Sequence, residues 1–398
     1  MSVLCEGRRA RIEVLGKRCS YRSMAVLYVP LVKAKGGEFA ALKELTSSVR
    51  TQICPIFDVT EIPWDFDSDS PAKIVDEHLA KVSENIFRSI GALSCGVDLT
   101  CLDPATRMAN GAHPLTWLFD DLRKKGVIAR PVVGPGYDAA YLAAAAAEIA
   151  TDKRGCVVRV VGQDRVFAST LATDLASVLA AVNLMESDAD LLLDLQTVAS
   201  GAEPATALAV AAVIQGLHSV SGWRELIMSS AGFPRDLSGY GQGLFVIPRT
   251  CLITWDSMRY RGVTRLPVFS DYAIDNHDRA EIDIDPKLIK GSTNVRYTVR
   301  TDWLVPKGPN WKDNSFSPMR TLCAQLVADA RFSGAAFSWG DSYISACANG
   351  GPTGNATTWR KVGVNHHVTF AVQQISSLIA ASVASGRSLV GPGAVPLP

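Results

Sequence analysis

Short apolar runs alternate with amphipathic segments along most of this chain. In the first unit, residues 26–32 form a continuous apolar run, Gly36-Gly37 breaks the pattern, and a helix is predicted from Glu38. A continuous apolar run is typical of a strand that is buried on both faces. Pro30 indicates a strand end or a bulge, because proline cannot donate to a sheet. The unit is therefore predicted to be a strand, a helix and a second strand.

The same unit recurs along the chain. Predicted strands cover residues 26–32, 53–57, 92–97, 127–133, 156–161, 190–195, 225–228 and 268–274. Predicted helices begin at residue 38 and then cover residues 72–90, 115–125, 139–149, 171–185, 205–217 and 243–260. Such alternation requires parallel strands with right-handed crossovers, and eight strands favour a closed (β/α)8 barrel over an open doubly wound sheet. GxGxxG, Walker A and GxSxG motifs are absent from the sequence.

The last third of the chain is less regular and is predicted to add helices and loops to a TIM-barrel-like α/β fold. Residues 294–305 alternate as an extended segment, and helices are predicted at 318–332 and 358–384. The glycine-rich stretch 337–355 between those helices is predicted to be a loop. The domain prediction is a basic extension at 1–23, one domain at 24–390 with its C-terminal elaboration from about 280, and a flexible tail at 391–398.

Composition excludes several classes of protein. Forty basic and 39 acidic residues give a formal net charge of +1, which offers no global attraction for a nucleic-acid backbone. No apolar run is long enough to predict a membrane span or a secretory signal. Nine cysteines are scattered without CxxC spacing, as expected for reduced thiols. The sequence therefore predicts a cytoplasmic protein with no membrane partner.

Polar residues at the predicted strand ends are the main candidates for chemistry. In a barrel of this kind the C-terminal strand ends form the working mouth. The converging set is Lys33, Asp58, Asp98, Asp194, Gln196, Ser229, Ser230 and Asp271, of which the four acids and Lys33 are the predicted catalytic residues. The carboxylates could bind a divalent cation through their oxygens, or two of them could act as the acid and the base in a hydrolysis. For any single acid, capping of the helix that follows it is an equally good explanation.

A second group of residues is predicted to bind substrate, and it comprises Lys35, Gln196, Ser229, Tyr272, Arg300, Trp339, Arg360 and His366. Lys35 precedes a helix start whose backbone amides would suit an anion, although a plain tight turn explains the same residues. Trp339 would stack on a base or sugar, or would anchor its loop. His366 and His367 are adjacent, so on a helix they diverge by about 100° and cannot both face one site.

Several ordered blocks resemble one known family. The blocks are YVPLVKAKGGEFAALKEL with PIFDVTE, FSDYAID, RYTVRTDWLVPKG, FSWGDSYISAC and TTWRKVGVNHHVTF. They are similar to the bacteriophage beta protein family from about residue 24 onward. The resemblance implies a single domain and a role in phage–host conflict, in antiphage defence or as a phage or mobile-element component. It supplies no catalytic assignment.

Two functional hypotheses follow. The first, by analogy with other barrels of this fold, is a barrel enzyme, a metal-assisted hydrolase acting on a polar or phosphorylated substrate. The second is a non-catalytic recognition or scaffold protein. It would use the mouth and the C-terminal loops to bind a phage or defence-system protein.

Overall fold

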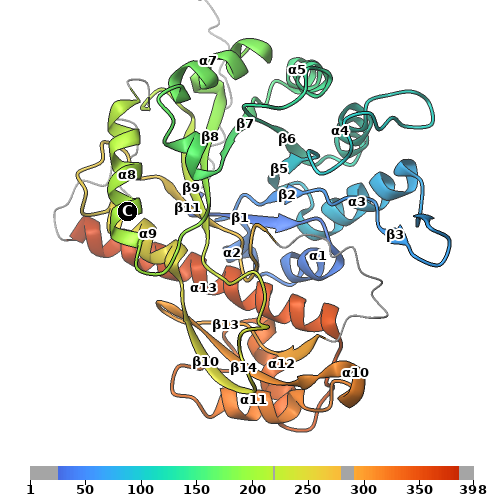
Figure 1. Ribbon diagram of the computed structural model, residues 1–398, viewed down its shortest axis with the longest axis vertical. Helices are drawn as coiled ribbons and strands as arrows, with labels where there is room; N and C mark the ends of the chain where they lie inside the picture. Colours follow the sequence, from blue (N-terminus) through green and yellow to red (C-terminus); the bar gives the residue numbers. More distant parts are fainter. Residues whose placement is uncertain (1–25, 218–219, 279–290, 385–398) are drawn as a thin grey trace, which may run out of the picture.

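Eight parallel strands close into a barrel in the computed structural model, which describes residues 26–217, 220–278 and 291–384. The barrel strands are β1 (Tyr28–Lys33), β2 (Ile56–Asp58), β5 (Ser94–Asp98), β6 (Ile128–Val133), β7 (Cys156–Val161), β8 (Ala189–Thr197), β9 (Glu225–Ala231) and β11 (Val268–Asp271). They follow one another around the barrel in chain order, and β11 pairs with β1 to close it (Figure 1). The predicted (β/α)8 fold is confirmed, and every predicted strand overlaps an observed one.

Helices surround the barrel on its outer side. The main ones are α1 (Gly36–Lys43), α3 (Val75–Ile90), α4 (Pro114–Lys124), α5 (Ala139–Asp152), α7 (Leu171–Ala181), α8 (Glu203–Gly216), α9 (Thr250–Met258) and α13 (Ala356–Ala384). Shorter elements are α2 (Ser47–Arg50), α6 (Gln163–Val166), the 3-10 turn Glu186–Asp188, and a hairpin of β3 (Trp64–Asp65) and β4 (Ser70–Pro71). Helix α13 lies alongside α1, where the Asn365 side-chain amide donates to the Ala41 carbonyl at 3.1 Å.

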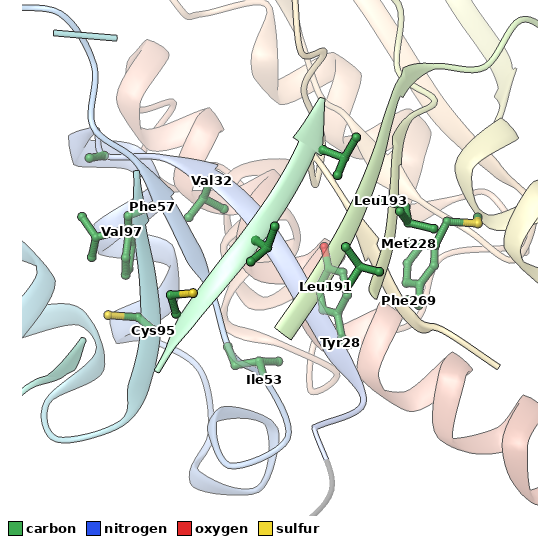
Figure 2. Packing of buried hydrophobic residues seen from close by; sticks show 14 of the residues in the cluster. Tyr28, Val32, Ile53, Phe57, Cys95, Val97, Leu191, Leu193, Met228 and Phe269 are labelled. Atoms are coloured by element: carbon green, nitrogen blue, oxygen red, sulfur yellow. The ribbon is translucent and has the colours of Figure 1, made fainter. Parts of the chain in front are cut away.

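Alternation along each strand divides the barrel residues between two apolar layers. Leu31, Ile56 and Leu192 belong to a cluster that fills the barrel interior. Their neighbours along the chain face outward and pack beneath the helices; Figure 2 shows this outer layer, including Phe57 and Leu191. Both layers are buried, which explains the continuous apolar runs. The same alternation decides whether a residue at a strand end faces the barrel axis or the helices.

The C-terminal elaboration is built on an antiparallel sheet with its own core. Its strands are β10 (Gly243–Pro248), β12 (Ser292–Asn294), β13 (Tyr297–Thr298) and β14 (Asp302–Asn310), and its helices are α10 (Trp311–Asn314), α11 (Met319–Val327) and α12 (Trp339–Ala348). Apolar residues of the sheet and helices form a separate buried cluster that also includes Val362 of α13. This sheet and its helices lie on one side of the barrel, below α13 in Figure 1.

Two predictions were wrong in this region. The predicted helix 243–260 is a strand and a helix, because residues 243–248 pair with β14 some 60 positions later. The predicted loop 337–355 contains α12, which Ser338 caps by accepting a hydrogen bond from the amide of Asp341 at 3.2 Å. The predicted extension 1–23 and tail 391–398 lie outside the described residues. Across the described ranges, no helix combines the length and apolarity that crossing a membrane requires.

Candidate functional site

Three carboxylates meet around one guanidinium at the C-terminal mouth of the barrel. Arg159 of β7 places Nη1 2.7 Å from Asp58 Oδ1 and 3.1 Å from Asp98 Oδ2. Its Nη2 lies 2.8 Å from Asp194 Oδ2. Asp58 and Asp98 are direct partners in the pairing of β2 with β5, which sets them side by side. The flanking strand residues Phe57 and Val97 pack in the outer layer, so the acids face the barrel axis.

Two tyrosines complete the hydrogen bonding. The Tyr272 hydroxyl donates to Asp194 Oδ2 at 2.6 Å and accepts from Arg159 Nη2 at 3.1 Å. The Tyr137 hydroxyl donates to Asp98 Oδ2 at 3.0 Å. Burial raises the pKa of each tyrosine well above its ordinary value, and the adjacent aspartate raises it further. Both phenols therefore stay protonated and act as donors. We call Asp58, Asp98, Arg159, Asp194 and Tyr272 the Arg159 cluster.

Asp58 differs from the other acids of the Arg159 cluster in its pKa and its exposure. Burial raises its pKa to about 6; Arg159 opposes this shift, while Asp98 adds to it. The Asp58 side chain is 19% exposed, against 3% for Asp98 and 0% for Asp194. Asp58 also borders a small cavity together with Lys33, Glu38, His277 and Arg360. It thus combines access from the mouth with a pKa near neutrality.

This raised pKa predicts a pH dependence of stability. Between about pH 4 and pH 6 the folded protein holds a proton on Asp58 that the unfolded chain has released. The stabilising contribution of the protonated carboxyl is therefore complete below about pH 4 and is lost as the pH rises through about 6. Relative to an Asp58→Asn variant, we expect the free energy of unfolding of the wild type to fall across this interval. Urea denaturation of both proteins at several pH values measures this difference in the free energy of unfolding. A difference that stays constant or grows in favour of the wild type as the pH rises would contradict the raised pKa of Asp58.

Asp271 does not join the other acids, which corrects the predicted convergence of four carboxylates. It lies on the outer side of the barrel, where Tyr28 donates its hydroxyl to Oδ1 at 2.5 Å. His367 of α13 places Nε2 3.1 Å from Oδ2, and Thr298 is hydrogen-bonded to the other ring nitrogen of His367 at 2.8 Å. Burial would raise the pKa of Asp271, but His367 holds it below the ordinary value. This carboxylate joins the last barrel strand to α13.

We predict a structural role for Asp271. The Asp271→Asn variant should lower the free energy of unfolding by about 1–3 kcal/mol, because a buried charge-assisted hydrogen-bond network loses an acceptor. Any activity per folded molecule should stay at the wild-type level. Chemical denaturation and an active-site titration separate the two effects. Lost activity with unchanged stability would return Asp271 to the catalytic group.

The remaining predicted residues fall into two places. Near the mouth, Lys33 borders the small cavity, and Lys35 is exposed at the start of α1. The backbone N–H of Gln196 donates to Asp194 Oδ1 at 3.1 Å. Ser229 is buried inside the barrel opposite Asp194, whereas Ser230 pairs with Asp271. Arg360 also reaches the mouth, with Nη1 2.9 Å from Asp275 Oδ2 and Nε 3.6 Å from Glu38 Oε1.

Three other predicted substrate-binding residues lie in the C-terminal elaboration or, in the case of His366, on the part of α13 that packs against it. Arg300 is exposed between β13 and β14. Trp339 stacks on Tyr343 with ring centroids 5.4 Å apart. His366 is fully buried, with Nδ1 2.8 Å from Asp341 Oδ2 and Nε2 2.8 Å from the Thr298 carbonyl oxygen. The contacts of Trp339 and His366 lie within the core of the C-terminal elaboration and include no member of the Arg159 cluster.

Arg159 and Tyr137 belong to the candidate site, but the sequence did not predict them as site residues. The signal for Arg159 is present in the run CVVRVV, because a lone arginine inside a strand buried on both faces needs acidic partners. Tyr137 follows the Gly134-Pro135-Gly136 turn and carries no comparable signal.

A divalent cation does not fit the Arg159 cluster. The guanidinium contacts all three carboxylates and so occupies the position that a shared cation would take. In the part of the chain that the structure describes, no group of three or more His, Cys, Asp or Glu residues is arranged to hold a metal ion. The divalent-cation site expected at these acids is therefore not formed.

The chain belongs to the Beta protein family, whose model matches residues 28–373. No curated protein matches significantly. Among solved structures, the catalytic module of a family 98 glycoside hydrolase from Streptococcus pneumoniae has 10% identity and a TM-score of 0.37, covering 67% of this chain and 50% of that one. The present chain thus spans about half the length of that module.

Two further solved structures show similarly low resemblance. Triosephosphate isomerase from Bartonella henselae has 8% identity and a TM-score of 0.33, covering 61% of this chain and 90% of its own. The carboxyl transferase domain of Rhizobium etli pyruvate carboxylase has 12% identity and a TM-score of 0.34, and the match covers 92% of this chain and 55% of that one.

Proposed function

We propose that this member of the Beta protein family is a cytoplasmic hydrolase that acts on an uncharged polar substrate at the mouth of its barrel. The observation that carries the proposal is Asp58, a partly exposed carboxyl whose pKa is raised to about 6. A carboxyl with a pKa near the working pH both takes and gives protons effectively. Asp58 would remove a proton from the attacking water or deliver one to the leaving group.

The rest of the Arg159 cluster positions Asp58. Asp98 and Asp194 are held by Arg159 and by the Tyr137 and Tyr272 hydroxyls, so their oxygens are already engaged. Carboxylates in such different surroundings commonly take different roles in one site. In this arrangement Arg159 prevents the three acids from repelling one another, while Asp58 keeps its access to the mouth.

Charge favours an uncharged substrate over a phosphorylated one. The three carboxylates of the cluster exceed its one guanidinium, so the mouth would repel a phosphate group. Of the nearby cations, Arg360 is itself paired with Asp275 and Glu38, and Lys33 shares the wall of the small cavity with these two acids. The predicted hydrolase of a phosphorylated substrate is therefore the less favoured form of the proposal.

A panel of chromogenic substrates tests this proposal. The purified full chain would be incubated with nitrophenyl glycosides, carboxylic esters and phosphate esters between pH 4 and pH 8. We expect release of nitrophenol from an uncharged substrate and none from the phosphate esters. Turnover of phosphate esters alone would contradict the charge argument, and no turnover of any substrate would favour a binding role.

One observation supports the alternative of a non-catalytic binding protein. The β3–β4 hairpin in the loop after β2 exposes 47% of Trp64 and 39% of Phe66. Exposed aromatic side chains in one segment are typical of an interaction surface. A phage or defence-system protein is the partner that the family resemblance would predict.

Phage plating separates the two roles. Cells that express the wild type, an Asp58→Asn variant or a Trp64→Ser/Phe66→Ser variant would be challenged with a phage panel. If the protein acts in phage–host conflict as an enzyme, cells with the hairpin variant should show the same plating efficiency as cells with the wild type. Cells with Asp58→Asn should then plate phage as the empty-vector control does. The reverse result would support the binding role, and equal plating by all strains, including an empty-vector control, would count against a role in defence.

A further inference from the structure

A second, larger cavity opens at the barrel mouth beside the Arg159 cluster. It has a volume of about 310 Å³ and lies between the loops that follow β5, β6 and β7. Its walls include Thr100, His113, Tyr137, Tyr141 and Arg165, and none of the five members of the Arg159 cluster lines it. We call it the ring cavity. Its volume falls at the lower end of the range for small-molecule sites, which suits a single ring.

The aromatic wall of the ring cavity is already in place. His113 and Tyr141 meet edge to face with centroids 5.9 Å apart, and Tyr137 and Tyr141 do so at 5.3 Å. The Tyr141 hydroxyl donates to the Val132 carbonyl at 3.1 Å and accepts from the Leu99 amide at 3.2 Å. His113 Nδ1 accepts from the Leu115 amide at 3.1 Å at the start of α4. These bonds hold the wall in one geometry, which lowers the entropy cost of binding.

Two acids supply acceptors at the edges of the ring cavity. Asp103 Oδ1 accepts from the Ala105 amide at 2.7 Å. Asp138 Oδ1 accepts from the amides of Ala140 and Tyr141 at 2.9 and 3.0 Å. Each carboxylate is oriented through one oxygen, and among the described residues no hydrogen bond engages the other oxygen of either group. Both acids line the cavity, so these oxygens are acceptors for ligand hydroxyls.

Charge and shape together define the ligand. Asp103 and Asp138 against the single Arg165 give the lining a formal surplus of negative charge. The Arg159 cluster next to it adds to that surplus. A phosphate is therefore disfavoured, whereas apolar ring faces with acceptors at their edges suit a ring that carries hydroxyl groups. We infer that the ring cavity binds an uncharged polyhydroxylated ring, supplied by a sugar or by the ribose of a nucleoside.

Tyr137 connects the ring cavity to the proposed chemistry. Its ring forms part of the cavity wall, and its hydroxyl donates to Asp98 at 3.0 Å. A ring bound against Tyr137 therefore lies one residue away from Asp98, which shares Arg159 with Asp58. This connection rests on the proposed function. Ring binding itself does not depend on it.

Saturation-transfer NMR on the full chain tests the inference. The probes are glucose, N-acetylglucosamine and adenosine, with glucose 6-phosphate as the charged counterpart. We expect saturation transfer to at least one uncharged probe. Comparing the two sugars with adenosine distinguishes a sugar from a nucleoside as the source of the ring. A cavity-filling Thr106→Phe variant should weaken that binding about tenfold or more, while a Tyr260→Phe control at an exposed site should bind as the wild type does.

The outcomes separate binding from catalysis. No transfer to any uncharged probe, tighter binding of glucose 6-phosphate than of glucose, or wild-type binding by a folded Thr106→Phe protein would each overturn the inference. If Thr106→Phe does not fold, Asp138→Asn replaces it, because asparagine keeps the helix cap and removes the charge. Tyr137→Phe should keep ring binding and shift the pH profile of any activity. Ring binding without hydrolysis would count against the proposed function alone, whereas Asp58-dependent hydrolysis without ring binding would overturn only this inference.

Discussion

Replacing Asp58 with asparagine should lower kcat/KM at least about 100-fold on any substrate that the protein hydrolyses. Asparagine keeps the shape of the side chain but cannot exchange a proton, and positioned acid–base groups contribute about 10²–10⁴-fold to rates. The wild-type pH–rate profile should show an inflection near pH 6. The rate should rise with pH through this point if Asp58 acts as a base and fall if it acts as an acid. The variant should lose this inflection.

The control for this experiment is Asp120→Asn on α4. Asp120 is 50% exposed, and in the part of the chain that the structure describes its ion pairs are with Arg123 and Lys124 of the same helix. Its loss should therefore leave kcat/KM unchanged. Asp58→Asn should remain folded, because it replaces a carboxyl that burial already makes hard to ionise. Wild-type activity in Asp58→Asn, or an inflection near pH 6 that persists in the variant, would exclude Asp58 as the proton-exchanging group.

Replacing Arg159 with methionine should have the largest effect on stability. Methionine has a similar length but no charge, so three buried carboxylates would face one another without a cation. Removing one partner of a buried ion pair typically costs about 3–5 kcal/mol. The free energy of unfolding of Arg159→Met, measured by urea denaturation at pH 7, should fall by about this amount.

Two further measurements separate the charge effect from lost packing. The deficit of Arg159→Met should shrink as the pH falls, because protonated carboxyls no longer repel one another. A second substitution, Asp58→Asn in the Arg159→Met background, should recover part of the loss. Arg88→Met, at an arginine that is 67% exposed, should change stability by less than about 0.5 kcal/mol. A loss in Arg159→Met that is the same at every pH would indicate packing instead of charge.

The position of Asp271 shows why strand ends alone do not define a site. The apolar run at 268–274 indicates a strand, but pairing with β9 and β1 ends at Asp271. Tyr272 faces the barrel interior, so its neighbour Asp271 faces the helices. One residue along a strand reverses the direction of a side chain. The sequence places both residues near the mouth, whereas only the pairing register determines which one reaches it.

The C-terminal elaboration was the hardest region to predict for a related reason. A short apolar run such as residues 243–248 is too short for its periodicity to distinguish a strand from a helix. The strand with which it pairs, β14, begins 54 residues after the run ends. Helix α12 contains glycine and serine and has little local preference for a helix. The burial of Ile344 and Cys347 in the core of the C-terminal elaboration stabilises it instead. Long-range contacts decide both cases.

The sequence by itself determined the barrel and the acids at its mouth. Eight apolar runs must be buried on both faces, and helices between them require parallel strands, so Asp58, Asp98 and Asp194 follow from the pattern. Only the tertiary structure placed Arg159 among them, moved Asp271 to the outer side and formed the ring cavity from three separate loops. The physical reason is that strand register and loop packing bring together residues that local periodicity cannot relate to one another.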